Sequence, residues 1–180
     1  MFVAFCRWLF RRNGWKVTGK LPDLPKYLVV VGPHTSNWDF IYGVAARDYV
    51  QTDIRFLGKK ELFKFPFKNF FLSLGGYPVN RHTNEKAVDA TIRVFKDMPE
   101  FRLALSPEGT RSKVPALRSG FYHIARGVNI PYVLVGLNYA TRTVEIAEAK
   151  MATGTWEEES AFVVRFFRNI KGKNPELGIS

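Results

Sequence analysis

The chain has 180 residues, of which 46% are hydrophobic and 24% charged, and its 27 Lys and Arg against 16 Asp and Glu give a formal net charge of +11. These values exclude an intrinsically disordered chain, and the length suits one domain with one sizeable core. The positive charge, combined with 15% aromatic residues, is typical of proteins that bind nucleic acid, anionic membranes or acidic substrates, and composition alone does not choose among them.

Cysteine content and apolar runs narrow the class of protein further. Cys6 is the single cysteine, so no intramolecular disulfide is expected and an oxidising compartment gains no support. Apolar runs such as residues 27–31 are far shorter than the roughly 18 residues of a membrane-spanning helix, so no span is expected. The first residues differ from a signal peptide because their basic residues follow the apolar ones, and no small-residue cleavage site comes after them.

Hydrophobic periodicity predicts helices that alternate with strands. The first element is a short amphipathic, basic helix over residues 2–12, which ends at Asn13-Gly14. The elements predicted after it are, in chain order, a strand at 27–31, a helix at about 38–50, a strand at 53–58, a helix at about 84–98, a strand at 101–105, a helix at about 117–127, a strand at 130–135, a more exposed strand at 143–149 and a helix at 156–170.

Two segments have no regular pattern. Between residues 59 and 76, lysines alternate with phenylalanines and Pro66 breaks any continuous helix. Residues 171–180 are expected to be a loose tail. The alternation elsewhere predicts a single α/β domain over residues 1–180, with helices packed on a largely buried sheet.

Binding and catalytic residues in open α/β sheets usually follow the carboxyl ends of strands, which directs attention to three segments, at 32–39, 75–81 and 106–112. In the first, Asp39 lies five residues after His34. Five residues within a helix would separate the two side chains by about 140°, but a loop-to-helix junction allows the carboxylate to fold back onto the imidazole. The pair would then be a catalytic dyad with His34 as a base. The alternative is a purely structural helix start, because Ser36 and Asp39 have the spacing of a capping box.

The other two segments are ambiguous when taken alone. Gly109 allows backbone amides to approach a substrate closely, and Arg111 suits a phosphate, but Glu108 and Arg111 equally fit a solvated ion pair in a plain turn. Arg81 likewise fits either a phosphate clamp or a surface turn.

Four blocks in order resemble the glycerolipid acyltransferases, the family of 1-acyl-sn-glycerol-3-phosphate acyltransferases. His34 to Asp39 is similar to the family's H-x4-D motif, and residues 107–112, Pro-Glu-Gly-Thr-Arg-Ser, are similar to its third block. Residues 76–81 and 130–135 resemble the second and fourth blocks, which are weak alone. Leu134 and Ser106 depart from the pattern, where the family commonly has a proline and an apolar residue. The resemblance spans about residues 27–139 and implies the glycerol-3-phosphate acyltransferase fold, with a mixed sheet flanked by helices.

The resemblance implies transfer of a fatty acyl group from acyl-CoA or acyl carrier protein to the hydroxyl of a lysophospholipid, above all 1-acyl-glycerol-3-phosphate, which becomes phosphatidic acid. His34 would act as the general base and Asp39 would orient it. The residues expected to bind the substrate are Arg81, Glu108, Gly109, Thr110 and Arg111, with backbone amides near Gly109 as an oxyanion site. No protein nucleophile and no cofactor are expected. No metal is expected either, because three scattered histidines and one cysteine make no familiar metal spacing.

The basic aromatic segments at 1–20 and 55–71 are expected to dock on an anionic membrane at its cytoplasmic face, as a peripheral attachment without a span. The docking residues proposed from the sequence are Phe5, Trp8, Arg11, Arg12, Lys60, Phe63, Lys64 and Phe67. For Phe70 and Phe71 a place in the core fits at least as well.

Three alternatives remain open. The first is an acceptor without phosphate, such as a lyso-ornithine lipid, which would leave the roles of Arg81 and Arg111 unassigned. Basic residues among aromatics also describe a non-enzymatic module that binds nucleic acid or anionic lipid, although no nucleic-acid recognition motif is present. A catalytically inactive family member is disfavoured by the presence of both His34 and Asp39.

Overall fold

A computed structural model describes residues 1–59, 63–79 and 84–179 of the chain. Its strands are β1 (Lys16–Thr18), β2 (Lys26–Gly32), β3 (Arg55–Lys59), β4 (Gly76–Val79), β5 (Phe101–Leu105), β6 (Pro131–Asn138), β7 (Thr143–Ile146) and β8 (Lys150–Met151). Its helices are α1 (Phe2–Arg12), α2 (Trp38–Val50), α3 (Lys68–Ser73), α4 (Asn84–Asp97), α5 (Gly120–Val128) and α6 (Trp156–Phe167), followed by a short 3-10 turn at Pro175–Leu177.

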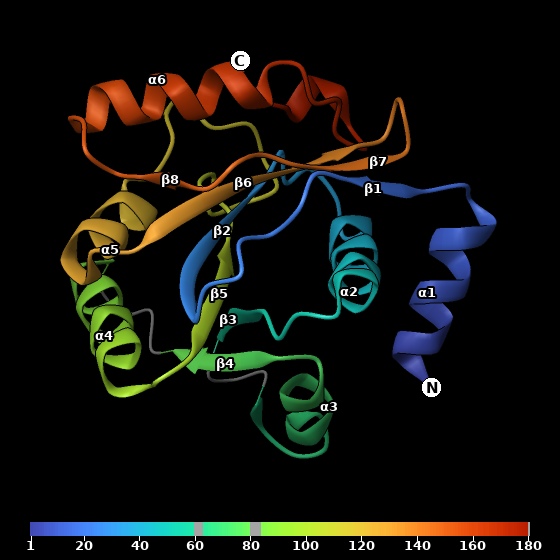
Figure 1. Cartoon of the computed structure of the whole chain (residues 1–180). Coiled ribbons are helices and arrows are strands. Elements are labelled where there is room, and N and C mark those ends of the chain that lie inside the picture. The colour runs from blue at the N-terminus through green and yellow to red at the C-terminus, as the bar shows by residue number, and fades with distance from the viewer. Residues whose placement is uncertain (60–62, 80–83, 180) are drawn as a thin grey trace.

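The described strands form one mixed sheet through the centre of the molecule, in the order β1-β7-β6-β2-β5-β3-β4, with β8 against the start of β6 (Figure 1). The strands β6, β2, β5, β3 and β4 run parallel to one another, and β7 and β8 run antiparallel to β6. Parallel strands bring their carboxyl ends to one edge of the sheet, which is where the chain places the loops of interest. The α/β class and the mixed sheet predicted for the chain are confirmed.

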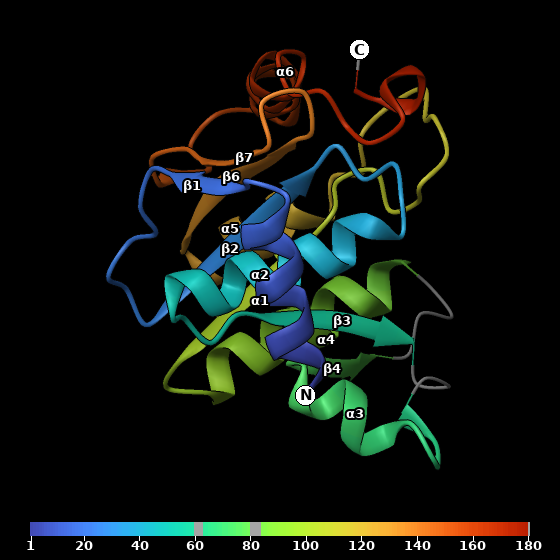
Figure 2. The ribbon, with the colours of Figure 1, turned by 90° about the vertical axis from the view of Figure 1, so that its right-hand side faces the viewer.

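Alternating residues of the central strands build a core on each face of the sheet. On β2, Leu28 and Val30 pack with the helices α4, α5 and α6, whereas Tyr27 and Val29 pack with α1 and α2. All four are 3% exposed or less, because a strand buried on both faces needs apolar residues at every position. The views in Figures 1 and 2 agree that α1 and α2 cover one face and that α4, α5 and α6 cover the other.

The structure corrects two expectations. Residues 143–146 are not a more exposed strand: Thr143 and Val144 are buried, because β1 pairs outside β7 and makes it an interior strand. Residues 171–179 are not loose, because they pack on the loop after β2. The Asn174 backbone N–H donates to Thr35 Oγ1 at 3.2 Å, and its side-chain amide donates to the Thr35 carbonyl at 2.9 Å.

The N-terminal helix is amphipathic as expected. Cys6 and Phe10 are buried against α2, and Arg7 forms an ion pair with Asp48 of α2 at 2.7 Å. Phe5 and Trp8 remain half exposed on the outer side. Within the described ranges, no helix has both the length and the apolar character needed to cross a bilayer.

Candidate active site

Three loops meet at the carboxyl edge of the parallel strands. The loop after β2 carries His34, the loop after β5 carries residues 106–119, and Tyr139 follows the last residue of β6. Because β2 lies between β5 and β6 in the sheet, these three loops are neighbours in space although far apart in sequence. The sheet order therefore assembles the site.

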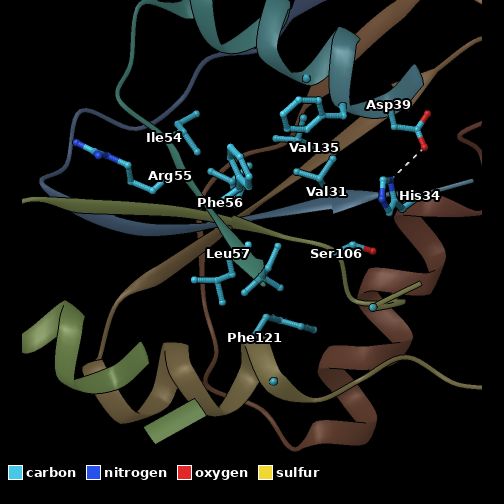
Figure 3. Close-up of a pocket in the computed structure, with 18 of the residues that line it drawn as sticks. Val31, His34, Asp39, Ile54, Arg55, Phe56, Leu57, Ser106, Phe121 and Val135 are labelled. Carbon is cyan, nitrogen blue, oxygen red and sulfur yellow. Dashed lines mark hydrogen bonds and ion pairs between the residues drawn. The ribbon is translucent and has the colours of Figure 1, made fainter. Parts of the chain in front are cut away.

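His34 and Asp39 lie together, as Figure 3 shows. The Nδ1 atom of His34 is 3.1 Å from Oδ2 of Asp39, a carboxylate that is 4% exposed at the first turn of α2. Since an ionised carboxylate only accepts hydrogen bonds, Nδ1 carries the proton and Nε2 of the neutral ring is the basic nitrogen. About 30% of the His34 side chain is exposed, so the ring is open to a substrate.

The capping box of the structural alternative is only half formed: the Ser36 hydroxyl accepts from the Trp38 N–H at 3.3 Å, and the N-cap residue Asn37 makes no side-chain cap bond. Asp39 supplies the half that is formed. Its Oδ2 also accepts from the backbone N–H groups of Thr35 and Ser36, both at 2.8 Å, which is the fold-back expected at a helix start. One carboxylate therefore stabilises the loop and contacts the imidazole. The two alternatives left open by the spacing turn out to be compatible.

Glu108 lies behind the His34 loop. It is 1% exposed, and its Oε2 accepts from the His34 backbone N–H at 2.6 Å and from the Ser106 hydroxyl at 3.3 Å. Burial raises the pKa of the Glu108 carboxyl, although the hydrogen bonds from His34 and Ser106 act in the opposite direction. Glu108 was expected to face the substrate, but the structure uses its carboxyl to hold the His34 backbone.

Several other residues of this loop line the cavity. Gly109 has a φ of +66°, and a Cβ at this position would lie 2.7 Å from Nε of Arg118, so only glycine fits the turn. Arg111 is exposed and donates a hydrogen bond to Oδ1 of Asn37. Arg111, Arg118 and Thr110 all line the cavity beside His34.

A cavity of about 1850 Å³ extends from His34 into the apolar interior. Typical small-molecule pockets have about 300–1,000 Å³, so this cavity has room for a long substrate. Its wall near His34 is formed by Val31, Val135 and Phe56, and Leu57 and Phe121 continue it on the other side of β3 (Figure 3). Its lining also includes Phe2 of α1 and Phe71 of α3.

The residues proposed to dock on a membrane fall into three groups. Phe5, Trp8 and Phe67 are 50%, 56% and 61% exposed. The cations Arg11, Arg12 and Lys64 are exposed as well. Phe63 is only partly exposed, because its ring packs against Phe71 at 6.0 Å.

Lys60, Arg81 and His82 lie outside the described residues. Among the residues that the structure does describe, no group of three or more His, Cys, Asp and Glu side chains is arranged to hold a metal ion.

Three residues of the site were missed by sequence reasoning. Tyr139 donates from its hydroxyl to Asp39 Oδ1 at 2.7 Å, Asn37 accepts from Arg111, and Arg118 packs on Gly109. Tyr139 is 100 residues from Asp39, so no local spacing reveals the contact. The one available signal was its position directly after a buried strand, where site residues are common.

The comparisons with known proteins agree with this geometry. The crystal structure of the 1-acyl-sn-glycerophosphate (LPA) acyltransferase PlsC from Thermotoga maritima is similar in fold, with a TM-score of 0.69 and 23% sequence identity over 92% of this chain and 74% of that one. No curated protein sequence matches the chain significantly. The sequence model of the acyltransferase family matches residues 16–137, a range that includes His34, Asp39 and Glu108. The chain therefore belongs to the acyltransferase family.

Proposed function

We propose that this enzyme transfers a fatty acyl group from a thioester, acyl-CoA or acyl carrier protein, to the free hydroxyl of 1-acyl-glycerol-3-phosphate and so forms phosphatidic acid. The observation that carries the proposal is the His34–Asp39 pair, which opens onto a long apolar cavity beside two arginines. The similar protein from Thermotoga maritima is named for the same acceptor, which supports the choice among lysolipids.

The basic nitrogen of His34 starts the reaction. Nε2 takes the proton of the acceptor hydroxyl as the oxygen attacks the thioester carbonyl, and the tetrahedral intermediate carries the negative charge on the former carbonyl oxygen. When the intermediate collapses, the carbon–sulfur bond breaks and the thiolate takes the proton back from His34. The products are an ester and a free thiol, and Asp39 keeps the imidazolium oriented throughout.

The loop after β5 supplies the polar groups around the reacting atoms. Gly109 is exposed and borders the cavity, but its own N–H donates to the Ser106 carbonyl at 3.2 Å, so the proposed oxyanion donors are the N–H groups of Thr110 and Arg111, which border the cavity after it. Arg111 and Arg118 border the same space and provide the positive charge that an acceptor phosphate requires. Thr110 lines the same cavity and offers a hydroxyl donor.

The acyl chains come from a bilayer, and the exposed aromatic side chains of α1 and of residues 63–73 are proposed to contact it. Phe2 of α1 packs edge-on against Phe70 of α3 at 5.2 Å, so these two elements form one docking surface. Both figures of the whole chain place the N-terminus beside α3 and far from α6 (Figures 1 and 2). Phe65, at 96% exposed, and Phe67 project from this surface.

The partner proposed for the docking surface is an anionic lipid membrane at its cytoplasmic face. Four exposed cations flank the aromatic residues, namely Arg11, Arg12, Lys64 and Lys68. Each Lys or Arg near an anionic leaflet contributes about 1 kcal/mol to attachment. The cavity also reaches Phe2 and Phe71 in these same elements, which gives a lipid chain an apolar path toward His34.

The test is a radiolabelled acyl transfer assay with wild type, His34→Ala, Asp39→Asn and the matched control Asp97→Asn on the exposed end of α4. Acceptors are lysophosphatidic acid, a lysolipid without phosphate and lyso-ornithine lipid, each offered with acyl-CoA and with acyl carrier protein. Loss of general base catalysis is expected to lower the rate by about 10²- to 10⁴-fold in His34→Ala, with Asp97→Asn unchanged. Full activity of His34→Ala would overturn the mechanism, and preference for lyso-ornithine lipid would overturn the acceptor.

A further inference from the structure

The two oxygens of the Asp39 carboxylate have different partners. Oδ2 accepts from His34 Nδ1 and from the backbone N–H groups of Thr35 and Ser36, whereas Oδ1 accepts from the hydroxyl of Tyr139 at 2.7 Å. Because Asp39 is 4% exposed, water has little access to replace a lost partner. A buried carboxylate depends on such donors to remain ionised and in a fixed orientation.

The Tyr139 ring is held in place from three directions. Trp15 packs edge-on against it at 4.9 Å and Tyr42 does so at 5.6 Å, while Trp15 and Tyr42 stack on each other at 4.4 Å. The Tyr139 backbone N–H donates to the Lys171 carbonyl at 2.8 Å. The Nζ atom of Lys173 lies 5.8 Å from the ring centroid. These contacts together direct the hydroxyl toward Asp39.

From this geometry we infer that Tyr139 is a positioning residue for the His34–Asp39 pair: its hydroxyl anchors Oδ1 so that Oδ2 faces Nδ1 of the imidazole. Tyr139 acts through Asp39 and makes no contact with the reacting atoms. The inference rests on the proposed acyl transfer for its effect on rate, but its effect on His34 is independent of any substrate.

The protonation of the Tyr139 hydroxyl is consistent with this role. Burial, followed by the hydrogen bond to Asp39 and the charge of Asp39, raises the pKa of Tyr139 well above its usual value, so the hydroxyl remains a donor. Other charged or titratable groups face the pair from every neighbouring element, namely Glu108 and Arg111 after β5, Tyr42 on α2 and Lys173 in the C-terminal segment.

The first test compares Tyr139→Phe with Tyr42→Phe. Each change removes one hydroxyl from the same aromatic cluster and keeps the ring, but the Tyr42 hydroxyl contacts Asn13 instead of Asp39. We expect kcat to fall about tenfold in Tyr139→Phe with KM within twofold, as for loss of one hydrogen bond to a charged group. Tyr42→Phe is expected to keep the wild-type kcat, and both variants to keep a melting temperature close to wild type. Equal kcat in the two variants would overturn the inference.

A double-mutant cycle separates positioning from packing. In an Asp39→Asn background, Tyr139→Phe is expected to lower kcat by less than twofold, because the group through which it acts is already lost. A full additional tenfold loss in that background would show that Tyr139 acts independently of Asp39.

A spectroscopic measurement decides the inference even if no acyl transfer is detected. Histidine-selective ¹⁵N labelling, with the His34 signals assigned from the His34→Ala spectrum, reports the hydrogen bond at Nδ1 directly. Tyr139→Phe is expected to shift the His34 ring ¹⁵N signals and Tyr42→Phe to leave them in place. Unshifted signals in Tyr139→Phe would refute the inference, whereas shifted signals without detectable transfer would count against the proposed function alone.

Discussion

The carboxyl group of Glu108 is almost completely removed from water, and its role follows from what it touches. Its Oε2 accepts from the backbone N–H of His34, so it fixes the start of the His34 loop from the loop after the neighbouring strand β5. Burial raises its pKa from the ordinary value of 4.5, which means that the folded protein disfavours the ionised form. The stabilisation by this group is therefore complete below pH 4.5 and is lost as the pH rises through the folded pKa.

Glu108→Gln keeps an acceptor oxygen and removes the charge, so its stability relative to wild type is expected to improve as the pH rises above about 4.5. Glu108→Ala leaves the His34 N–H without its partner and is expected to cost about 1–3 kcal/mol. Urea unfolding from pH 4 to 8 measures both. A Gln variant whose stability follows wild type in parallel across this range would contradict the raised pKa.

Gly109→Ala is expected to destabilise the protein by about 1–3 kcal/mol, because it adds left-handed backbone strain and displaces Arg118. Gly14 has a similar φ of +69° with open space around its missing Cβ, so Gly14→Ala isolates the backbone cost. Thermal unfolding of the two variants measures how much more stability Gly109→Ala loses than Gly14→Ala. Equal losses would mean that Arg118 moves aside freely.

At the scale of the elements, α6 is attached to the sheet by one buried ionic cluster. Glu159 of α6 is 1% exposed, Lys150 of β8 lies 2.5 Å from its Oε1, and the hydroxyl of Tyr132 on β6 donates to its Oε2. Thr155 and Glu158 cap the start of the helix reciprocally. Burial raises the pKa of Glu159, but the hydrogen bonds from Lys150 and Tyr132 outweigh it and lower the pKa overall.

A lowered folded pKa means that the stabilisation by Glu159 is present above pH 4.5 and is lost as the pH falls through the folded value. Glu159→Gln is therefore expected to be less stable than wild type at pH 7, by about 2 kcal/mol, and the two proteins are expected to converge in acid. That difference corresponds to roughly 4–8 °C in Tm for a chain of this size. A constant gap between pH 7 and pH 3 would argue against the ionic cluster.

The elements also show where sequence reasoning succeeds. Long periodic segments such as 38–50 and 101–105 were predicted at the observed boundaries, because their apolar spacing is dictated by burial. The strand β4 was missed since Gly76 and Pro78 argue against a strand. It tolerates them because, among the described strands, it lies at the end of the sheet order and pairs with β3 alone, where proline is acceptable.

For the candidate site, the sequence predicted the residues that stand in local motifs and missed those that depend on the sheet order. His34 and Asp39 are five residues apart and fold back locally. Arg111 reaches Asn37 across 74 residues, and Tyr139 reaches Asp39 across 100. Such contacts arise only once β2, β5 and β6 are side by side.

For the whole molecule, the net charge of +11 is compatible with the proposed attachment to an anionic surface, and the proposal assigns that attachment to one part of the molecule. Arg11 and Arg12 lie on the docking helix α1, whereas Arg165 and Arg168 are exposed at the far end of the molecule, on and just after α6 (Figure 1). Replacing either pair of arginines by glutamates lowers the net charge of the chain by the same amount.

Arg11→Glu/Arg12→Glu is expected to weaken binding to vesicles of anionic phosphatidylglycerol by tenfold or more, as two lost contacts of about 1 kcal/mol each require. Arg165→Glu/Arg168→Glu is expected to change it by less than threefold, since these residues face away from the bilayer. Vesicle flotation measures both, with filter binding of DNA and RNA in parallel. Equal losses in the two variants, or retention on nucleic acid without flotation, would refute the docking surface.

The anchoring of residues 171–174 on the His34 loop has a consequence for the order of assembly. Asn174 is 139 residues from Thr35, so the loop is completed by one of the longest-range contacts in the chain. During synthesis the sheet strands emerge long before this segment, and contacts of such separation form late in folding. In a nascent chain the loop that carries His34 would thus be completed only after the strands on either side of it have been synthesised.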